Sequence, residues 1–185
     1  EELKILHNTT GTNIFCSNMS IDPKTGNVVV MRGDGFQSGG ELNTGIKDVV
    51  IFDYKAEEIR PLSQLDEAFE LESARWYGTT LNLDNGEILM LGGIDEENAG
   101  SPTPEIYNHE TGIRELPGAK IDDVATEGNV FYYPHAWQID SGDVIVIERG
   151  GPDHEIYRMD VTGEGSVEVI GKLPFDTEKG LPSLM

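Results

Sequence analysis

Residues 75–93 read RWYGTTLNLDNGEILMLGG, and this stretch decides the fold. A turn at residues 84–86 (Asp-Asn-Gly) separates two segments that are mostly apolar or β-branched. This pattern is typical of a β-hairpin, because glycine adopts a positive φ at little cost. The second segment, residues 88–91, is wholly apolar, which predicts a strand buried on both faces.

The same plan occurs twice more, at residues 14–33 and at residues 131–151. The turn glycines of the three copies are Gly26, Gly86 and Gly142, so they are spaced 60 and 56 residues apart. A second hairpin follows in every copy, which gives each repeat four predicted antiparallel strands. Four-stranded repeats of about 50 residues are typical of a kelch-type β-propeller, in which the repeats stack as blades.

We therefore expect residues 1–185 to form one all-β domain with blade repeats at about 12–65, 72–118 and 128–174. Residues 175–185 are interpreted as the start of a further blade. Propellers typically have about four to eight blades, so three blades are expected to be part of a larger ring. The alternative fold is a β-sandwich, although a sandwich does not require the same plan three times.

The chain has 34 acidic and 13 basic residues, and its formal net charge is −21. This charge argues against nucleic acid or an anionic membrane surface as a partner, because both would repel the chain. No apolar run approaches the ~18 residues of a membrane span. Residues 1–4 show no signal-peptide pattern. Helix signals are few, and residues 65–70 predict one short turn.

Three residues are predicted to occupy equivalent positions on successive first strands. Cys16 precedes the turn residue Asp22 by six positions, whereas Tyr77 and Tyr133 precede theirs by seven. The innermost strands of a propeller line its central channel, so equivalent residues on adjacent blades become neighbours there. We therefore expect Cys16 and Tyr77 to meet. Because Cys16 is the only cysteine, the chain has no internal disulfide and no multi-cysteine metal cluster.

Two short motifs make the sequence resemble the copper radical oxidases of the galactose oxidase and glyoxal oxidase family. Residues 15–16 (Phe-Cys) precede the first hairpin, and residues 75–77 (Arg-Trp-Tyr) follow one blade later. The triplet is closer to the glyoxal oxidase branch, and residues 104–107 are similar to a Glu-x-Tyr stretch of the family. The resemblance covers nearly all of the chain. It implies the first part of a seven-bladed propeller that a C-terminal β-sandwich domain follows.

The resemblance also implies a site. Cys16 and Tyr77 would form a thioether crosslink, and Tyr77 would bind copper and hold a radical. Trp76, Tyr133 and Phe131 would line the substrate pocket. Copper and a tyrosine radical each store one electron, so together they serve the two-electron oxidation of an aldehyde, a primary alcohol or a carbohydrate, with O2 reduced to H2O2. The family resemblance further implies secretion.

The sequence also departs from the family. The copper site of the family needs a Tyr-His pair, and none occurs here. The other copper ligands are therefore expected outside this chain, and these residues alone are expected to be inactive. The alternative function is a non-catalytic kelch module that binds glycan or protein through loops such as 35–47 and 95–104. Taken singly, Cys16 also fits a small buried residue and Tyr77 an aromatic that packs between blades.

Overall fold

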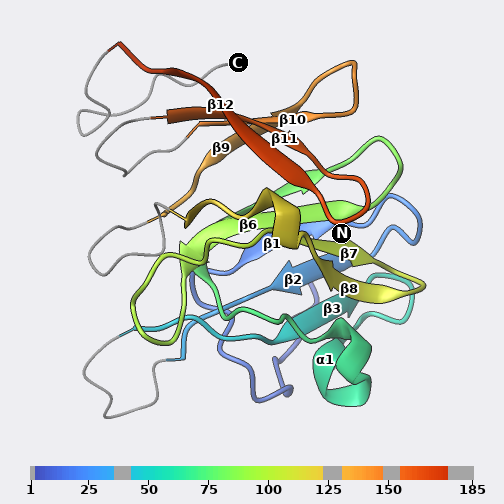
Figure 1. Cartoon of the computed structure of the whole chain (residues 1–185). Helices are drawn as coiled ribbons and strands as arrows, with labels where there is room; N and C mark the ends of the chain where they lie inside the picture. The colour runs from blue at the N-terminus through green and yellow to red at the C-terminus, as the bar shows by residue number, and fades with distance from the viewer. Residues whose placement is uncertain (1–2, 36–42, 123–130, 148–154, 175–185) are drawn as a thin grey trace.

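Figure 1 shows a computed structural model of the chain, which describes residues 3–35, 43–122, 131–147 and 155–174. The described residues form three four-stranded antiparallel sheets and very little helix. Within each sheet the strands lie side by side in chain order. Each sheet is therefore one blade, and the predicted all-β fold class is confirmed.

The three blades follow one another along the chain without exchanging strands. The first consists of β1 (Asn18–Ile21), β2 (Val28–Met31), β3 (Val49–Asp53) and β4 (Glu58–Pro61), the second of β5 (Trp76–Asn82), β6 (Ile88–Ile94), β7 (Glu105–Asn108) and β8 (Gly112–Glu115), and the third of β9 (His135–Gln138), β10 (Val144–Ile147), β11 (Glu155–Asp160) and β12 (Ser166–Lys172). The blades stack face to face, with the second in the middle (Figure 1).

Short helical turns connect the first two blades. α1 (Leu62–Leu65) and the 3₁₀ turn η1 (Glu67–Phe69) lie at the predicted position, although the helical segment begins three residues before the predicted start at residue 65. A second 3₁₀ turn, η2 (Pro117–Ala119), follows β8. In the described part of the chain, no helix has the length and hydropathy that crossing a membrane requires.

β6 is buried along its whole length, as its apolar sequence predicts. Ile88 and Met90 pack in the core between the first two blades, whereas Leu89 and Leu91 pack in the core between the second and third. Alternate side chains of a strand point to opposite faces of the sheet, so β6 supplies both cores. The second blade thus has no solvent-facing side along this strand.

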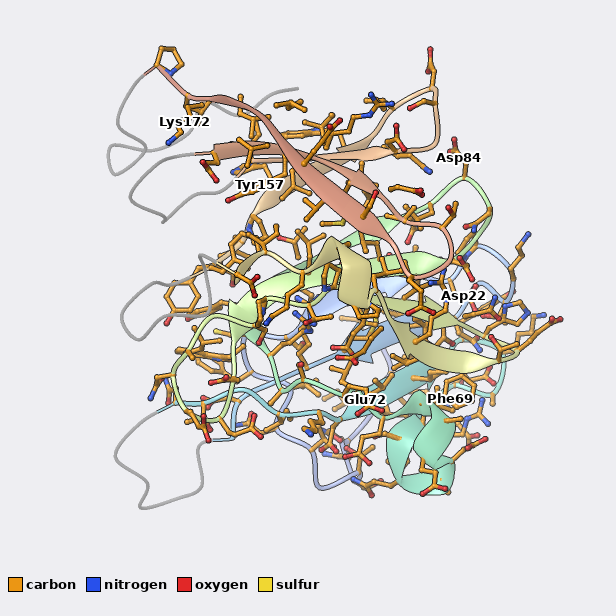
Figure 2. The ribbon with its side chains drawn as sticks, in the orientation of Figure 1. Asp22, Phe69, Glu72, Asp84, Tyr157 and Lys172 are labelled. Carbon is orange, nitrogen blue, oxygen red and sulfur yellow. The ribbon has the colours of Figure 1, made fainter. Side chains whose placement is uncertain are left out.

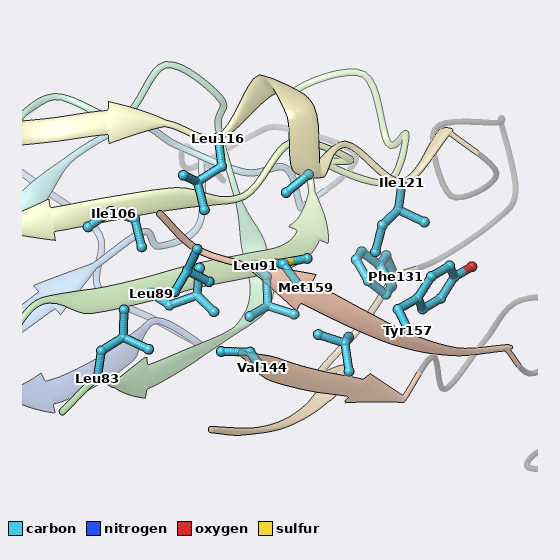
Figure 3. Close-up of a cluster of buried hydrophobic side chains, with 13 residues drawn as sticks. Leu83, Leu89, Leu91, Ile106, Leu116, Ile121, Phe131, Val144, Tyr157 and Met159 are labelled. Carbon is cyan, nitrogen blue, oxygen red and sulfur yellow. The ribbon is translucent and has the colours of Figure 1, made fainter. Parts of the chain in front are cut away.

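Figure 3 shows the core between the second and third blades. Leu89 and Leu91 face Val144 and Met159 across the boundary. The thirteen buried residues of this core are Leu83, Leu89, Leu91, Ile106, Leu116, Ala119, Ile121, Phe131, Val144, Val146, Tyr157, Met159 and Val161.

The tips of the first hairpins lie on one side of the stack, as Asp22 and Asp84 show in Figure 2. The turn glycines Gly26, Gly86 and Gly142 have φ values of 78°, 89° and 92°, which confirms the predicted turns. Since the strands of a hairpin are antiparallel, the starts of the first strands gather at the opposite end of the blades. The candidate residues lie at that end.

The first strand of each outer blade starts later than the sequence predicts. Residues 14–17 form a turn, in which the Ser17 N–H donates to the Ile14 carbonyl at 3.2 Å, and β1 begins only at Asn18. In the third blade β9 begins at His135. The prediction of extended chain from residues 14 and 131 was therefore wrong, because the backbone turns before pairing begins.

Burial of β6 on both faces makes its side chains sensitive to truncation. Leu89 is fully buried, so Leu89→Ala should lower the free energy of unfolding by about 2–5 kcal/mol through lost burial and a new cavity. Ile170 is 51% exposed, so Ile170→Ala should change it by less than about 0.5 kcal/mol. Urea unfolding followed by circular dichroism measures both, and equal losses would contradict the burial of β6 on both faces.

Candidate functional site

The strand registers place Cys16, Tyr77 and Tyr133 at one equivalent position. Each lies two residues before the residue that pairs with the end of the apolar second strand. Those pairs are Asn18 with Met31, Thr79 with Leu91, and His135 with Ile147. The alignment that the turn spacing predicts is therefore confirmed by backbone pairing.

The backbone at this position is left-handed in all three blades. The φ values are 55° at Cys16, 60° at Tyr77 and 45° at Tyr133. A side chain in this region costs about 1–2 kcal/mol, so three occurrences at one blade position mark a constraint of the architecture. The conformation interrupts strand alternation and turns these side chains out of the regular blade faces.

The structure brings Cys16 and Tyr77 together. The Cys16 Sγ lies 3.1 Å from the Tyr77 Oη, within hydrogen-bond distance, although 61 residues separate the two in the chain. The blades are also joined through the backbone, because the Tyr133 N–H donates to the Tyr77 carbonyl at 2.9 Å. The three equivalent residues thus form one connected group across three blades.

Aromatic rings surround the Tyr77 ring. Trp76 stacks on it with a centroid distance of 4.0 Å and an interplanar angle of 23°. Tyr133 lies at 5.1 Å, and Tyr132 meets the ring edge-on at 5.4 Å. Tyr132 was missed in the sequence, where its only signal is the aromatic run at residues 131–133. These rings cover part of the Tyr77 ring, which stays partly exposed.

Phe131 does not join this group. Its side chain is 2% exposed and packs in the core between the second and third blades. The sequence places it beside Tyr133, but the turn that precedes β9 directs the two rings differently. We therefore leave Phe131 out of the candidate site. The His135 ring stacks on Trp137, with a centroid distance of 5.7 Å.

The surroundings of Tyr77 favour the protonated phenol. The hydrogen bond with Cys16, followed by burial, raises the pKa of Tyr77 to about 12 from its ordinary 10.0. Neighbouring Tyr133 and Tyr132 act in the same direction, because further negative charge nearby is unfavourable. At neutral pH the free side chain therefore keeps its proton, and a cation that binds Oη has to replace it.

A fully buried ion pair anchors the segment that carries Trp76 and Tyr77. Arg75 donates to the Glu105 Oε1 through Nε at 3.0 Å and through Nη2 at 2.8 Å. Its Nη1 donates to the Gly92 carbonyl at 3.0 Å, and its Nη2 also donates to the Thr103 carbonyl. The Glu of the predicted Glu-x-Tyr stretch thus holds the chain directly before the aromatic pair.

Arg32 is a second buried cation that sequence reasoning missed. It is 1% exposed, its φ is 76°, and its Nη2 donates to the Thr79 carbonyl at 2.6 Å. Its Nε and Nη1 have no hydrogen-bond partner among the described residues. Burial, then the charge of Arg75, lowers the pKa of Arg32. The feature of the sequence that could have revealed Arg32 is the difference between the repeats, because the position equivalent to Arg32 in the second repeat is Gly92.

The described ranges contain no group of three His, Cys, Asp or Glu side chains that could hold a metal ion. The donor set available to copper here is the Tyr77 phenol with the Cys16 sulfur beside it. This pair fits one corner of a copper site, since a phenolate oxygen binds Cu(II) and a sulfur beside the hydroxyl eases ring oxidation. The remaining ligands would have to come from other parts of the protein.

Comparison with known proteins identifies the fold. No protein-family model matches the sequence, and no curated protein matches it. Among solved structures, a fungal alcohol oxidase of the AA5 family in complex with copper matches with a TM-score of 0.64 and 20% identity. YjhT, a kelch-type propeller, matches with a TM-score of 0.60 and 11% identity. The chain therefore shares the propeller fold of both proteins.

The matched proteins are longer than this chain. It covers 31% of the length of the alcohol oxidase and 52% of the length of YjhT, while 89% and 86% of the chain itself are matched. The chain thus corresponds in extent to several consecutive blades of these longer proteins. Identities of 20% and 11% establish the shared fold and leave the chemistry to the side chains.

Removing one partner of the buried ion pair should be more damaging than removing both. Glu105→Ala leaves the Arg75 charge buried and uncompensated, which should lower the free energy of unfolding by about 3–5 kcal/mol. A double variant, Arg75→Met with Glu105→Leu, should lose distinctly less. Urea unfolding of the two variants checks this order, and a larger loss in the double variant would show that the pair itself is strongly stabilising.

The contact with Cys16 should be visible in the titration of Tyr77. In Cys16→Ala the pKa of Tyr77 should fall from about 12 toward 10.0, because the hydrogen bond is the largest cause of the shift. The raised pKa stabilises the folded chain below about pH 10, and this contribution is lost as the pH rises through 12. Difference absorbance of tyrosinate measures the titration, with Tyr77→Phe to identify the signal. An unchanged curve in Cys16→Ala would argue against the contact.

Proposed function

We propose that the chain is part of a copper radical oxidase that oxidises a primary alcohol or an aldehyde with O2. The observation that carries this proposal is the 3.1 Å contact between the Cys16 Sγ and the Tyr77 Oη. Two residues 61 positions apart, both with left-handed backbones, are held on adjacent blades with the thiol against the phenol hydroxyl. Packing alone does not require this combination of strain and chemistry.

The covalent step is a carbon–sulfur bond between the Cys16 Sγ and the ring carbon ortho to the Tyr77 hydroxyl. The thiol and the ring carbon each lose a hydrogen, so two electrons and two protons leave, and O2 accepts them as H2O2. The sulfur contacts the hydroxyl that the ortho carbon flanks. Bound copper would supply the one-electron chemistry that links this oxidation to O2.

The aromatic rings around Tyr77 support the same proposal. Trp76 covers one face of the Tyr77 ring, and this shielding would protect an oxidised tyrosine from solvent and from stray reductants. Tyr133 is 38% exposed and tilted against the ring, so it is the side chain here that faces both the site and solvent. We assign Trp76 to the shield and Tyr133 to the substrate pocket.

For the substrate, the overall reaction converts a primary alcohol and O2 to an aldehyde and H2O2, or converts an aldehyde, hydrated by one water molecule, and O2 to the acid and H2O2. The substrate gives up two electrons and two protons, and O2 takes up both. The copper alcohol oxidase that shares the fold supports an alcohol as substrate. Secretion of the protein is part of the same proposal.

The crosslink tests the function directly. The longest natural chain that contains these residues is loaded with Cu(II) in air, digested, and analysed by mass spectrometry under thiol-reducing conditions. Peptides that contain Cys16 and Tyr77 should appear joined, with the mass of two hydrogens missing. Tyr133→Phe is the matched control, since it removes a neighbouring phenol without touching the sulfur and should leave the crosslink intact. Tyr77→Phe should abolish it.

Free Cys16 after full copper loading in air would overturn the oxidase proposal. The better interpretation would then be a non-catalytic kelch module that binds glycan or protein through its loops. If the crosslink forms, the longest natural chain that contains these residues becomes the material for a peroxide assay with a panel of alcohols and aldehydes.

A further inference from the structure

Arg32 combines three features that are each unfavourable. A non-glycine residue with a φ of 76° is strained, and the equivalent residue in the second blade is Gly92, with a φ of 66°. The guanidinium is buried, and no ion pair with Arg32 occurs among the described residues. Two of its N–H-bearing atoms, Nε and Nη1, also lack partners in this part of the chain. A glycine would avoid every one of these costs, so the side chain is retained for another reason.

The boundary between the first two blades is shaped around this side chain. A Cβ atom on Gly78 would lie 1.9 Å from the Arg32 Nη1, so any residue with a side chain would displace the guanidinium. At the boundary between the second and third blades, the glycine lies on the earlier blade and the large residue on the later one. There a Cβ on Gly92 would lie 2.7 Å from the ring of Pro134, which occupies the position of Gly78 in the third blade. Each boundary therefore pairs one large residue with one glycine.

Arg32 is tied to the Cys16 turn through its own backbone. Its N–H donates to the Asp48 carbonyl at 3.0 Å, and the Asp48 carboxylate accepts from the Thr12 hydroxyl at 2.7 Å. Two residues further, the Asp34 N–H donates to the Asn13 carbonyl at 3.0 Å. The chain that leads into the Cys16 turn is thus held by the segment that carries Arg32.

At its other end Arg32 is tied to the Tyr77 segment. Its Nη2 donates to the Thr79 carbonyl at 2.6 Å, and its Nη1 lies against Gly78, the residue directly after Tyr77. The Thr79 hydroxyl in turn donates to the Pro134 carbonyl at 2.7 Å, next to Tyr133. One side chain therefore spans the blade boundary at the level of the Cys16–Tyr77 pair.

We propose that Arg32 is a positioning residue that sets the distance between the Cys16 sulfur and the Tyr77 ring and thereby controls thioether formation. The role in crosslinking rests on the proposed oxidase function, whereas the role in holding the pair does not. Arg32 acts through the two segments that it joins and touches neither reacting atom. A misplacement of about 1 Å can slow a positioned reaction by on the order of 10²-fold, so loss of Arg32 should have a measurable effect on the rate of crosslinking.

The first measurement uses the chain without metal. Because Cys16 is the only cysteine, the S–H stretching band in a Raman spectrum reports this thiol alone. Arg32→Gly should move the band from that of a hydrogen-bonded thiol toward that of a free thiol, since the Tyr77 hydroxyl is no longer held in place. Arg32→Lys keeps a charged donor for the Thr79 carbonyl and should restore most of the band position.

The second measurement is the rate of crosslinking with Cu(II) in air, followed by mass spectrometry. Arg32→Gly should slow it about tenfold to a hundredfold, and Arg32→Lys should recover part of the rate. Arg60→Gln is the matched control, because Arg60 lies on β4 of the same blade with an exposed side chain, and it should change neither the band nor the rate.

Gly78→Ala tests the same contact from the other side and keeps Arg32 present. The new Cβ displaces the guanidinium, so the variant should shift the band and slow crosslinking as Arg32→Gly does. In the double variant Arg32→Gly with Gly78→Ala, the alanine should add little to the band shift and to the loss of crosslinking rate, because the arginine that it clashes with is gone. The contact of the new Cβ with the Gly92 carbonyl, at 2.8 Å, is present in both backgrounds and cancels.

The two readouts separate the two proposals. A wild-type band and rate in both Arg32→Gly and Gly78→Ala would overturn the positioning role. A longest natural chain of wild-type sequence that never crosslinks would overturn the oxidase, and the Raman band would still decide whether Arg32 holds the pair. If Arg32→Gly fails to fold by circular dichroism, Arg32→Lys and Gly78→Ala carry the test.

Discussion

The burial of β6 on both faces is the constraint on which the rest of the structure depends. A strand whose alternate side chains enter two different cores needs a sheet on each side, so the second blade is stable only between neighbours. The same stacking brings the starts of three first strands to one end of the molecule. Contacts between residues about 60 positions apart follow from this repetition, without long loops to deliver them.

The candidate site belongs to the boundaries between blades. Cys16, Tyr77 and Tyr133 come from three different blades. The Cys16 thiol contacts the Tyr77 hydroxyl, and hydrogen bonds through Thr79 and the Tyr77 carbonyl join the Tyr77 and Tyr133 segments. No single blade contains more than one of these three residues. The strained backbone at each of these positions is held by the surrounding sheets, so the rigidity of the stack is what preserves the geometry.

The sequence predicts the blade repeat well, but it predicts neither the left-handed backbone of the candidate site nor the fit between blades. Turn glycines and the apolar run at residues 88–91 are local signals, and they were sufficient for the blades and for the pairing of Cys16 with Tyr77. The left-handed backbone was not predictable, because Cys16 and Tyr77 have no intrinsic preference for it. The roles of Arg32 and Phe131 depend on how neighbouring blades fit together, and the sequence shows at most that Arg32 replaces the glycine of the second repeat.

The alternation of large and small residues at the blade boundaries has a consequence for the ancestry of the chain. If the second blade were deleted, the Arg32 side chain would meet the ring of Pro134, and if it were duplicated, Gly92 would meet Gly78 across an unfilled gap. Blades of this protein are therefore not interchangeable modules. Each boundary fits only one order of blades. Unequal recombination between repeats would therefore be selected against even where the blades themselves fold well.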